Sequence, residues 1–184
     1  TIEPILGNRW YYSSQNGNIR VTTTAQGTST VSATPSGWGA DRKSFLTNFD
    51  LYRYGGETSG CPLATGCGRI IAGSFRVWES VTGGVPTSSW KANSPDLTKN
   101  TLGARSIINQ VAYAIDSPTV AIAGTNDGNV AIGFGMGQDV ADSATWVNVT
   151  DANAVLPNRP VLDVFMDPRD SRVGYAVVGG FDQN

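Results

Sequence analysis

The sequence contains no histidine and only two cysteines among its 184 residues. A zinc site built from cysteine and histidine needs more ligands than these two thiols can supply, so this kind of site is excluded. Catalysis of the Ser-His-Asp or Cys-His type is also excluded, because both use histidine as the base. From the residues present we expect no metal and no cofactor.

Charged residues are scarce and nearly balanced. Asp, Glu, Lys and Arg make up 15% of the chain, and the net charge is -2. Because no basic stripe is present to neutralise phosphates, we expect no nucleic-acid partner and no attraction to an anionic membrane. The sequence also lacks an apolar run of the roughly 18 residues needed to cross a bilayer, so we expect no membrane insertion.

The two cysteines, Cys61 and Cys67, lie close together in a loop rich in glycine, proline and threonine. This spacing can close a small disulfide, which is typical of proteins in an oxidising compartment. The alternative is a pair of free thiols in a mobile loop. The low lysine content and the many Asn, Thr and Gly residues fit an exported protein, so we expect an extracellular or cell-surface location.

The most informative feature of the chain is a repeat. Similar short segments recur at residues 18–21, 74–77 and 129–132, spaced by 56 and then 55 residues, and Trp90 and Trp146 also stand 56 residues apart. Periods of about 40–55 residues built from short strands are typical of propeller blades. The 22 glycines suit many tight turns. We therefore predict an all-β fold, a β-propeller of four-stranded antiparallel blades.

The third repeat gives the clearest strand pattern, with apolar runs predicting strands at 107–115, 120–123, 130–134 and 145–149. Residues 126–129 contain the strongest hairpin signal, because Asp-Gly tolerates the positive φ values of a type I′ turn. The next inner strand is expected at 161–166.

The other repeats follow the same order. The first predicts strands at 10–12, 19–23 and 29–33, and the second predicts strands at 43–48, 51–54, 75–80 and 89–92. The middle hairpin of the second repeat is enlarged by residues 55–72, which contain both cysteines. Propellers usually place binding determinants on such loops. The alternative is a surface loop with no function beyond its disulfide.

These repeats divide the chain into a partial blade (1–40), two blades (41–100 and 101–157) and a second partial blade (158–184), about three and a third blades in one propeller segment. A closed propeller has roughly four to eight blades. We therefore expect further polypeptide, or another protein chain, to complete the ring. The alternative is a compact three-blade domain.

Two segments resemble a known family. Residues 76–90, with the sequence RVWESVTGGVPTSSW, resemble the Asp-box (BNR) repeat, whose usual form is Ser-x-Asp-x-Gly-x-Thr-Trp. Residues 156–181 look like a blade junction of sortilin-type and xyloglucanase-like propellers. Thr82 stands where the box usually has Asp. The resemblance implies a propeller fold, and in this family the box is a folding turn at the blade periphery.

Aromatic rings are the candidate ligand contacts, because sugars commonly stack on flat apolar surfaces. We expect Trp38, between Gly37 and Gly39, to be an exposed ring on a loop. Tyr54 and Trp78 are further binding candidates. A polysaccharide is therefore a candidate partner.

Asp163 is the candidate catalytic carboxylate, because it interrupts an apolar inner strand and could face a central channel. The alternative is a paired polar residue at a strand end. Loop acids such as Asp41 are expected to be solvated. A glycosidase needs two carboxyl groups flanking the scissile bond, and no such pair is evident.

Two functions remain. We favour an extracellular binding or scaffold propeller segment that belongs to a larger polypeptide or assembly, without enzyme activity of its own. The alternative is a fragment of a xyloglucanase-like glycoside hydrolase that acts on a β-glucan through paired carboxylates.

Overall fold

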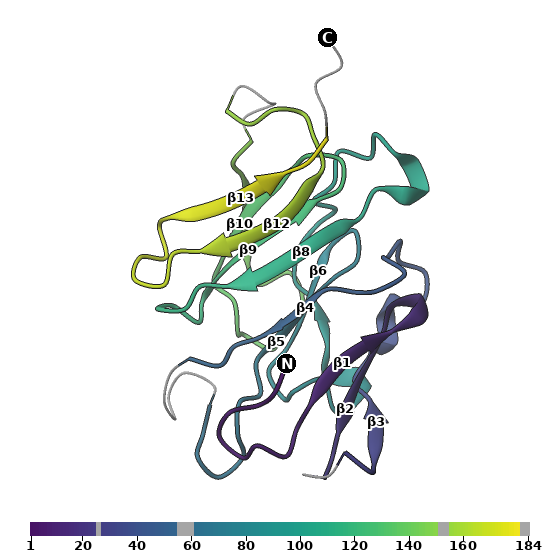
Figure 1. Cartoon of the computed structure of the whole chain (residues 1–184), viewed down its shortest axis with the longest axis vertical. Helices are drawn as coiled ribbons and strands as arrows, with labels where there is room; N and C mark the ends of the chain where they lie inside the picture. Colours follow the sequence, from purple (N-terminus) through teal and green to yellow (C-terminus); the bar gives the residue numbers. More distant parts are fainter. Residues whose placement is uncertain (25–26, 55–60, 151–154, 181–184) are drawn as a thin grey trace.

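The computed structural model describes residues 1–24, 27–54, 61–150 and 155–180 (Figure 1). In this part of the chain, thirteen strands are joined by turns and by four short 3-10 segments, η1 (Gln15–Gly17), η2 (Ser36–Trp38), η4 (Thr87–Ser89) and η5 (Gly103–Arg105). None of the described helical segments is long and apolar enough to cross a membrane. The predicted all-β class is confirmed.

The strands form four open antiparallel sheets that follow one another along the chain. The first sheet contains β1 (Tyr11–Ser14), β2 (Asn18–Thr22) and β3 (Thr30–Ser32). The second contains β4 (Phe49–Leu51), β5 (Ile70–Gly73), β6 (Val77–Ser80) and β7 (Lys91–Ala92). The third contains β8 (Ile108–Tyr113), β9 (Val120–Thr125), β10 (Val130–Phe134) and β11 (Thr145–Asn148). The fourth contains β12 (Val161–Met166) and β13 (Gly174–Val178).

Equivalent hydrogen bonds show that the first three sheets share one strand order. Just beyond the last strand of each sheet, a backbone amide donates to the carbonyl at the start of the neighbouring strand: Ala33 to Ile19 (2.9 Å), Asn93 to Val77 (2.8 Å) and Val149 to Val130 (2.9 Å). Strands β1–β3 therefore correspond to the second, third and fourth strands of the complete sheets. In place of a first strand, residues 1–3 bond to residues 9–11 through the amides of Glu3 and Tyr11.

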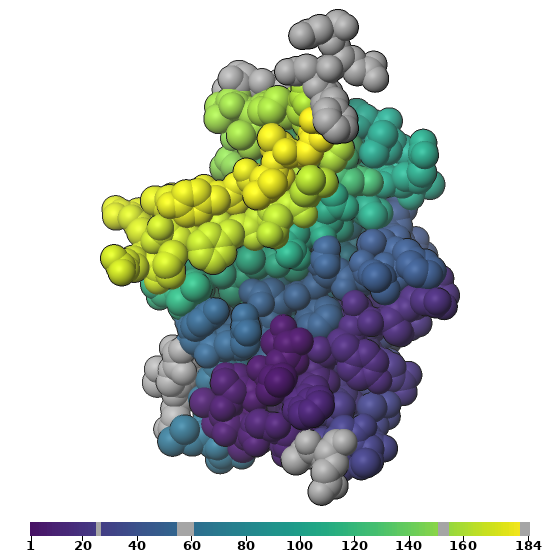
Figure 2. All heavy atoms as spheres, in the orientation of Figure 1, coloured from purple at the N-terminus to yellow at the C-terminus, as the bar shows by residue number. Residues whose placement is uncertain are grey.

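The sheets stack face to face. Figure 2 shows the chain as successive layers along the longest axis, and Figure 1 shows the first and fourth sheets at opposite ends. Strand β8 contacts β4 and β5, and β12 contacts β8 and β9. Strands β5 and β9 are buried along their whole length. Such continuous apolar runs are typical of strands that are covered on both faces.

The turn between β9 and β10 forms where the sequence predicts it. Gly128 has a φ of 94°, a conformation that side-chain-bearing residues rarely adopt. A Cβ atom at Gly128 would also lie 2.9 Å from the carbonyl oxygen of Arg159, which belongs to the connection leading to the fourth sheet. Glycine is therefore required here both by the turn and by the close packing of the next sheet.

The strand assignment at the start of the second repeat is wrong. Its first strand is Phe49–Leu51 and not 43–48, and its second is Ile70–Gly73 and not 51–54. The enlarged connection therefore joins the first and second strands of the sheet, while residues 74–76 make the tight turn to β6. The reason is burial, because all four residues of β5 are buried whereas Arg53 and Tyr54 are exposed. Residues 55–60 lie outside the described part of the chain.

Glu79, on β6, holds the second and third sheets together. Its side chain is 3% exposed, and its carboxylate accepts hydrogen bonds from the Tyr113 hydroxyl (2.7 Å), the Asn93 amide group (2.7 Å) and the Gly137 backbone amide (2.8 Å). The guanidinium of Arg69 lies 3.4 Å away. Burial, and then the charge of Glu79, raise the pKa of the Tyr113 hydroxyl well above its ordinary value. The tyrosine therefore stays neutral and donates.

Asp41 is a second buried carboxylate, which contradicts the prediction that it is solvated. It accepts hydrogen bonds from the Ser74 hydroxyl (2.8 Å), the Trp78 indole (2.9 Å) and two guanidinium nitrogens of Arg76 (2.9 and 3.1 Å). Burial acts to raise the pKa of Asp41, but these donors outweigh it and the pKa is lowered. The carboxylate fixes the turn that leads into β6.

Cys61 and Cys67 form a disulfide, as the sequence predicts. The backbone amide of Cys67 donates to the carboxylate of Glu3 (2.9 Å), which is fully buried and also accepts from the amides of Ile5 and Leu6. Burial acts to raise the pKa of Glu3, but these three hydrogen bonds outweigh it and the pKa is lowered. The disulfide loop is thereby joined to the first residues of the chain.

We expect Tyr113→Phe to lower the free energy of unfolding by about 2 kcal/mol, because it removes a buried donor to the charged carboxylate of Glu79. Urea unfolding followed by tryptophan fluorescence measures the loss. The matched control is Tyr12→Phe, whose ring is 41% exposed and should give little change. Equal effects of the two substitutions would show that the buried hydroxyl makes no net contribution.

The contribution of Asp41 should depend on pH. Because the folded state lowers its pKa below the ordinary value of 3.8, the ionised carboxylate stabilises the fold above that value, and this stability is lost as the pH falls through the lower, folded value. The difference in unfolding free energy between the wild type and Asp41→Asn should be constant above about pH 5 and should shrink below about pH 4. If the difference stays constant down to about pH 2.5, this assignment is wrong. Asp139→Asn, in an exposed loop, is the control.

Replacing both Cys61 and Cys67 by serine should lower the unfolding free energy by about 2 kcal/mol, the entropy expected for closing a short loop. Urea unfolding of the variant and of the wild type, with and without reductant, gives this value. Freshly isolated wild-type protein that is denatured without reductant should contain no reactive thiol. Detection of two reactive thiols would refute the disulfide.

Candidate functional site

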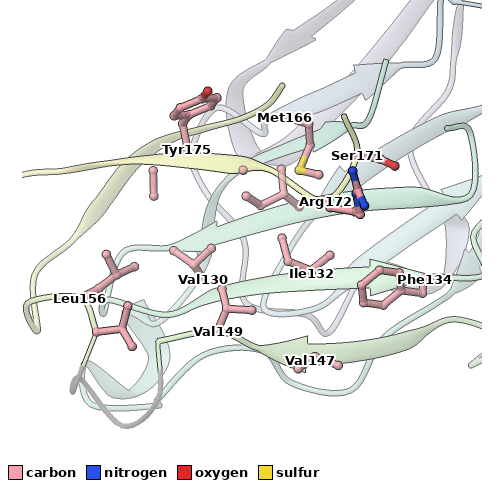
Figure 3. A pocket seen from close by; sticks show the side chains of 14 residues that line it. Val130, Ile132, Phe134, Val147, Val149, Leu156, Met166, Ser171, Arg172 and Tyr175 are labelled. Atoms are coloured by element: carbon pink, nitrogen blue, oxygen red, sulfur yellow. The ribbon is translucent and has the colours of Figure 1, made fainter. Parts of the chain in front are cut away.

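An apolar groove with a volume of about 520 Å³ lies between the third and fourth sheets (Figure 3). Strands β9 and β10 contribute Ile122, Val130 and Ile132 to its lining, β11 contributes Val147, and Val149 lines it one residue beyond β11. The fourth sheet lines the other side of the groove through Met166, Gly174 and Ala176. The groove is therefore lined by β-strands on two adjacent sheets.

Strand alternation explains why these apolar side chains face the groove. On β10, a Cβ atom at Gly133 would lie 2.6 Å from the ring of its strand partner Trp146. The Trp146 indole bonds to the Asn93 carbonyl, so this face of the third sheet is turned toward the second sheet. Ile132 and Phe134 therefore point to the opposite side, toward the groove. Phe134 is 46% exposed and Val147 is 47% exposed. A group of neighbouring exposed apolar side chains often marks a surface that binds another molecule.

The turn between β12 and β13 borders the groove at one end. Ser171 and Arg172 line the groove, and the Ser171 amide donates to the carboxylate of Asp116 in the turn between β8 and β9 (3.1 Å). The Arg172 guanidinium bonds to Asp170 at 2.8 Å and lowers the pKa of Asp170 to about 2. This end of the groove is therefore polar, and the remainder is apolar.

The fourth sheet also exposes apolar side chains on its other face. Phe165 and Tyr175 stack with their ring centroids 6.1 Å apart, and Leu162 and Val177 are each 56% exposed. In Figure 3 the Tyr175 ring lies on the opposite side of β13 from Val130 and Ile132. We call this second surface, defined by Leu162, Phe165, Tyr175 and Val177, the outer face of the fourth sheet.

The lining of the groove is suited to binding an apolar occupant. Among its described lining residues, Arg172 and Tyr175 are the ones with titratable side chains, and the Tyr175 ring is turned to the outer face of the fourth sheet. Burial of apolar surface would supply most of the affinity for an occupant.

The prediction that Trp38 is an exposed ring is wrong. Trp38 is 1% exposed, and Trp78 is 7% exposed. Both belong to the hydrophobic core, and Gly37 lies so close to the Trp78 ring that a Cβ atom there would be 2.6 Å from it. The large apolar area of each indole is removed from water, so neither ring presents a surface for sugar stacking.

Tyr54 is accessible, since its side chain is 37% exposed. Its ring packs edge-on against Tyr52, with ring centroids 6.1 Å apart, and the Arg53 guanidinium lies 5.7 Å from the ring centroid. Its binding role stays a prediction.

Asp163 is exposed on β12 and accepts hydrogen bonds from residues of β8 and β12. Its carboxylate accepts from the Gln110 side chain on β8 (3.1 Å) and from the Val164 amide (2.9 Å). Asp163 thus connects β12 to β8, and its catalytic role stays a prediction. Among the described residues, no three His, Cys, Asp or Glu side chains lie close enough together to hold a metal ion.

The groove was not predicted from the sequence, although a signal for it is present. Residues 130–134 and 145–149 carry apolar side chains on both faces of each predicted strand. Such strands need cover on both sides, and the groove is the side that remains uncovered.

Comparisons with protein-family models, with curated proteins and with solved structures find no match for this chain. Function is therefore proposed from the geometry of the described residues.

Proposed function

We propose that this chain is a segment of an extracellular β-propeller scaffold of the Asp-box type, and that it binds further polypeptide through the groove and the outer face of the fourth sheet. The observation that carries the proposal is the groove itself. The groove lies beside the two-stranded fourth sheet. If that sheet had a third and a fourth strand, they would cover the part of the third sheet that the groove exposes.

The second and third sheets support this geometry. Each has four strands. In the third sheet, β10 and β11 extend the packing on the second sheet that β8 begins. The fourth sheet begins in the same way, because β12 contacts β8 and β9. Two more strands beside β13 would fill the groove and cover Ile132, Phe134 and Val147.

The outer face of the fourth sheet supports a second contact. Soluble monomers rarely leave several large apolar side chains together in water, and such patches usually mark a protein interface. A further stacked sheet would cover Phe165 and Tyr175 in the way that β12 covers β9. Successive sheets that stack in chain order, together with the residues that resemble the Asp-box repeat, favour the propeller as the complete architecture.

The disulfide supports an extracellular location, because such bonds persist in oxidising compartments. Polypeptide is the proposed partner in preference to polysaccharide. The burial of Trp38 and Trp78 removes two of the three rings on which a sugar was predicted to stack.

A lysine placed on either apolar surface should reduce association. We expect the wild-type chain to self-associate as its concentration rises, and we expect Val147→Lys in the groove and Val177→Lys on the outer face each to shift it toward monomer. Sedimentation velocity over a concentration series measures the change. Val140→Lys, at a loop position that is 59% exposed and outside both surfaces, is the control.

A wild-type chain that stays monomeric at every concentration and melts cooperatively would contradict the proposal. It would favour a compact three-blade domain, whose exposed apolar residues need no partner.

A further inference from the structure

Tryptophan side chains connect neighbouring sheets through the same hydrogen bond at two places. The indole N–H of Trp90, next to β7, donates to the backbone carbonyl of Ala33 in the first sheet (2.9 Å). The indole N–H of Trp146, on β11, donates to the carbonyl of Asn93 in the second sheet (2.8 Å). Each acceptor stands one residue beyond the last strand of the preceding sheet.

Val149 is the third member of this series. Like Ala33 and Asn93, it follows the last strand of its sheet, and its amide makes the equivalent bond, to the carbonyl of Val130. The carbonyl of Val149 is therefore the equivalent acceptor at the edge of the third sheet.

Burial separates the third acceptor from the first two. Ala33 is fully buried and Asn93 is 1% exposed, whereas Val149 is 40% exposed and lines the groove. All five tryptophans of the chain lie in the described part. Besides Trp90 and Trp146, Trp10 donates to Gly7 and Trp78 to Asp41, while the indole nitrogen of Trp38 is buried without a partner. None of these indoles donates to Val149, so an indole donor at this position would have to come from other polypeptide.

The junction between the second and third sheets contains a second contact of this kind. The amide of Asp142, in the loop before Trp146, donates to the carbonyl of Ala92 (2.8 Å). Ala92 pairs with the second residue of β6, and Asn148 pairs with the second residue of β10, so the two residues occupy equivalent positions. The Asn148 carbonyl is thus the equivalent acceptor for a loop amide of the occupant.

We propose that the groove binds a β-hairpin with a tryptophan near the start of its second strand, and that the indole N–H of this tryptophan donates to the carbonyl of Val149. The first strand of the hairpin pairs antiparallel with β13. This inference rests on the proposed function and adds the chemistry of the partner: an apolar hairpin with one indole donor.

Tryptophan fits this position better than another apolar residue. Covering the Val149 carbonyl without a donor leaves a buried acceptor unpaired, which is unfavourable. Phenylalanine fills space but has no donor, whereas indole combines a large apolar surface with a single N–H. The two covered junctions in this chain both use that combination.

A synthetic hairpin tests the inference. The probe is a backbone-cyclised peptide with residues 128–149 of this chain, which contains β10, β11 and Trp146. The matched peptide carries Trp146→1-methyltryptophan, which keeps the ring and removes its N–H. Calorimetric titration into the intact chain should give a dissociation constant about tenfold weaker for the methylated peptide, the effect of one buried hydrogen bond.

Amide chemical shifts should change at Ile132, Val147 and Val149 on binding. Val147→Lys in the intact chain should abolish binding of both peptides, while Val140→Lys, outside the groove, should leave it unchanged.

The outcomes separate the inference from the proposed function. Equal affinities of the two peptides, both sensitive to Val147→Lys, would overturn the indole donor and retain strand docking. Failure of both peptides to bind, or binding that Val147→Lys does not affect, would overturn both claims. Self-association of the wild type that Val147→Lys disrupts, and that the hairpin peptide does not inhibit, would identify a second copy as the occupant of the groove and overturn the hairpin.

Discussion

The buried carboxylate of Glu79 is the contact on which the packing of the middle sheets depends. Its hydrogen-bond donors come from β8, from the end of β7 and from the loop after β10, and its ion-pair partner Arg69 precedes β5. A buried charge is tolerated only when its hydrogen bonds are complete, so these segments must meet at one point. The second and third sheets are thereby fixed in spacing and in register.

Other polar contacts fix the remaining turns and junctions. Asp41 fixes the turn into β6 through Arg76 and the Trp78 indole, and an indole-to-carbonyl bond closes the outer part of each covered junction. The groove lies on the face of the third sheet that β12 and β13 leave partly uncovered. It combines exposed apolar side chains with a backbone acceptor at the position where both covered junctions have an indole.

Much of the fold could be predicted where local and tertiary signals agree. In the third repeat, apolar runs and the turn at residues 126–129 placed the strands within two residues of their observed ends, and β12 was placed at its observed bounds. The second repeat failed because its first strand is only three residues long and is followed by a long connection. There the pattern favoured residues 51–54 as a strand, although burial selects Ile70–Gly73.

The site was harder to predict, since exposure is a property of neighbouring sheets and not of a segment. Trp38 is flanked by glycines and looks like a loop residue, yet packing in the core buries it. Asp41 also lies in a loop, and its donors come from a turn more than thirty residues later. Conversely, Val147 and Val149 look like ordinary strand residues, and only the two-stranded fourth sheet beside them leaves them uncovered.

The indole bonds have a mechanical consequence. A load that pulls the first and fourth sheets apart would act on three junctions in series, two of which contain an indole-to-carbonyl bond. The junction between the third and fourth sheets relies instead on apolar packing and on contacts such as Gln110 to Asp163 that reach solvent. This junction would separate first, and the two junctions behind it would keep their indole bonds. The chain would thus unfold under tension in steps, beginning at the junction between the third and fourth sheets, beside the groove.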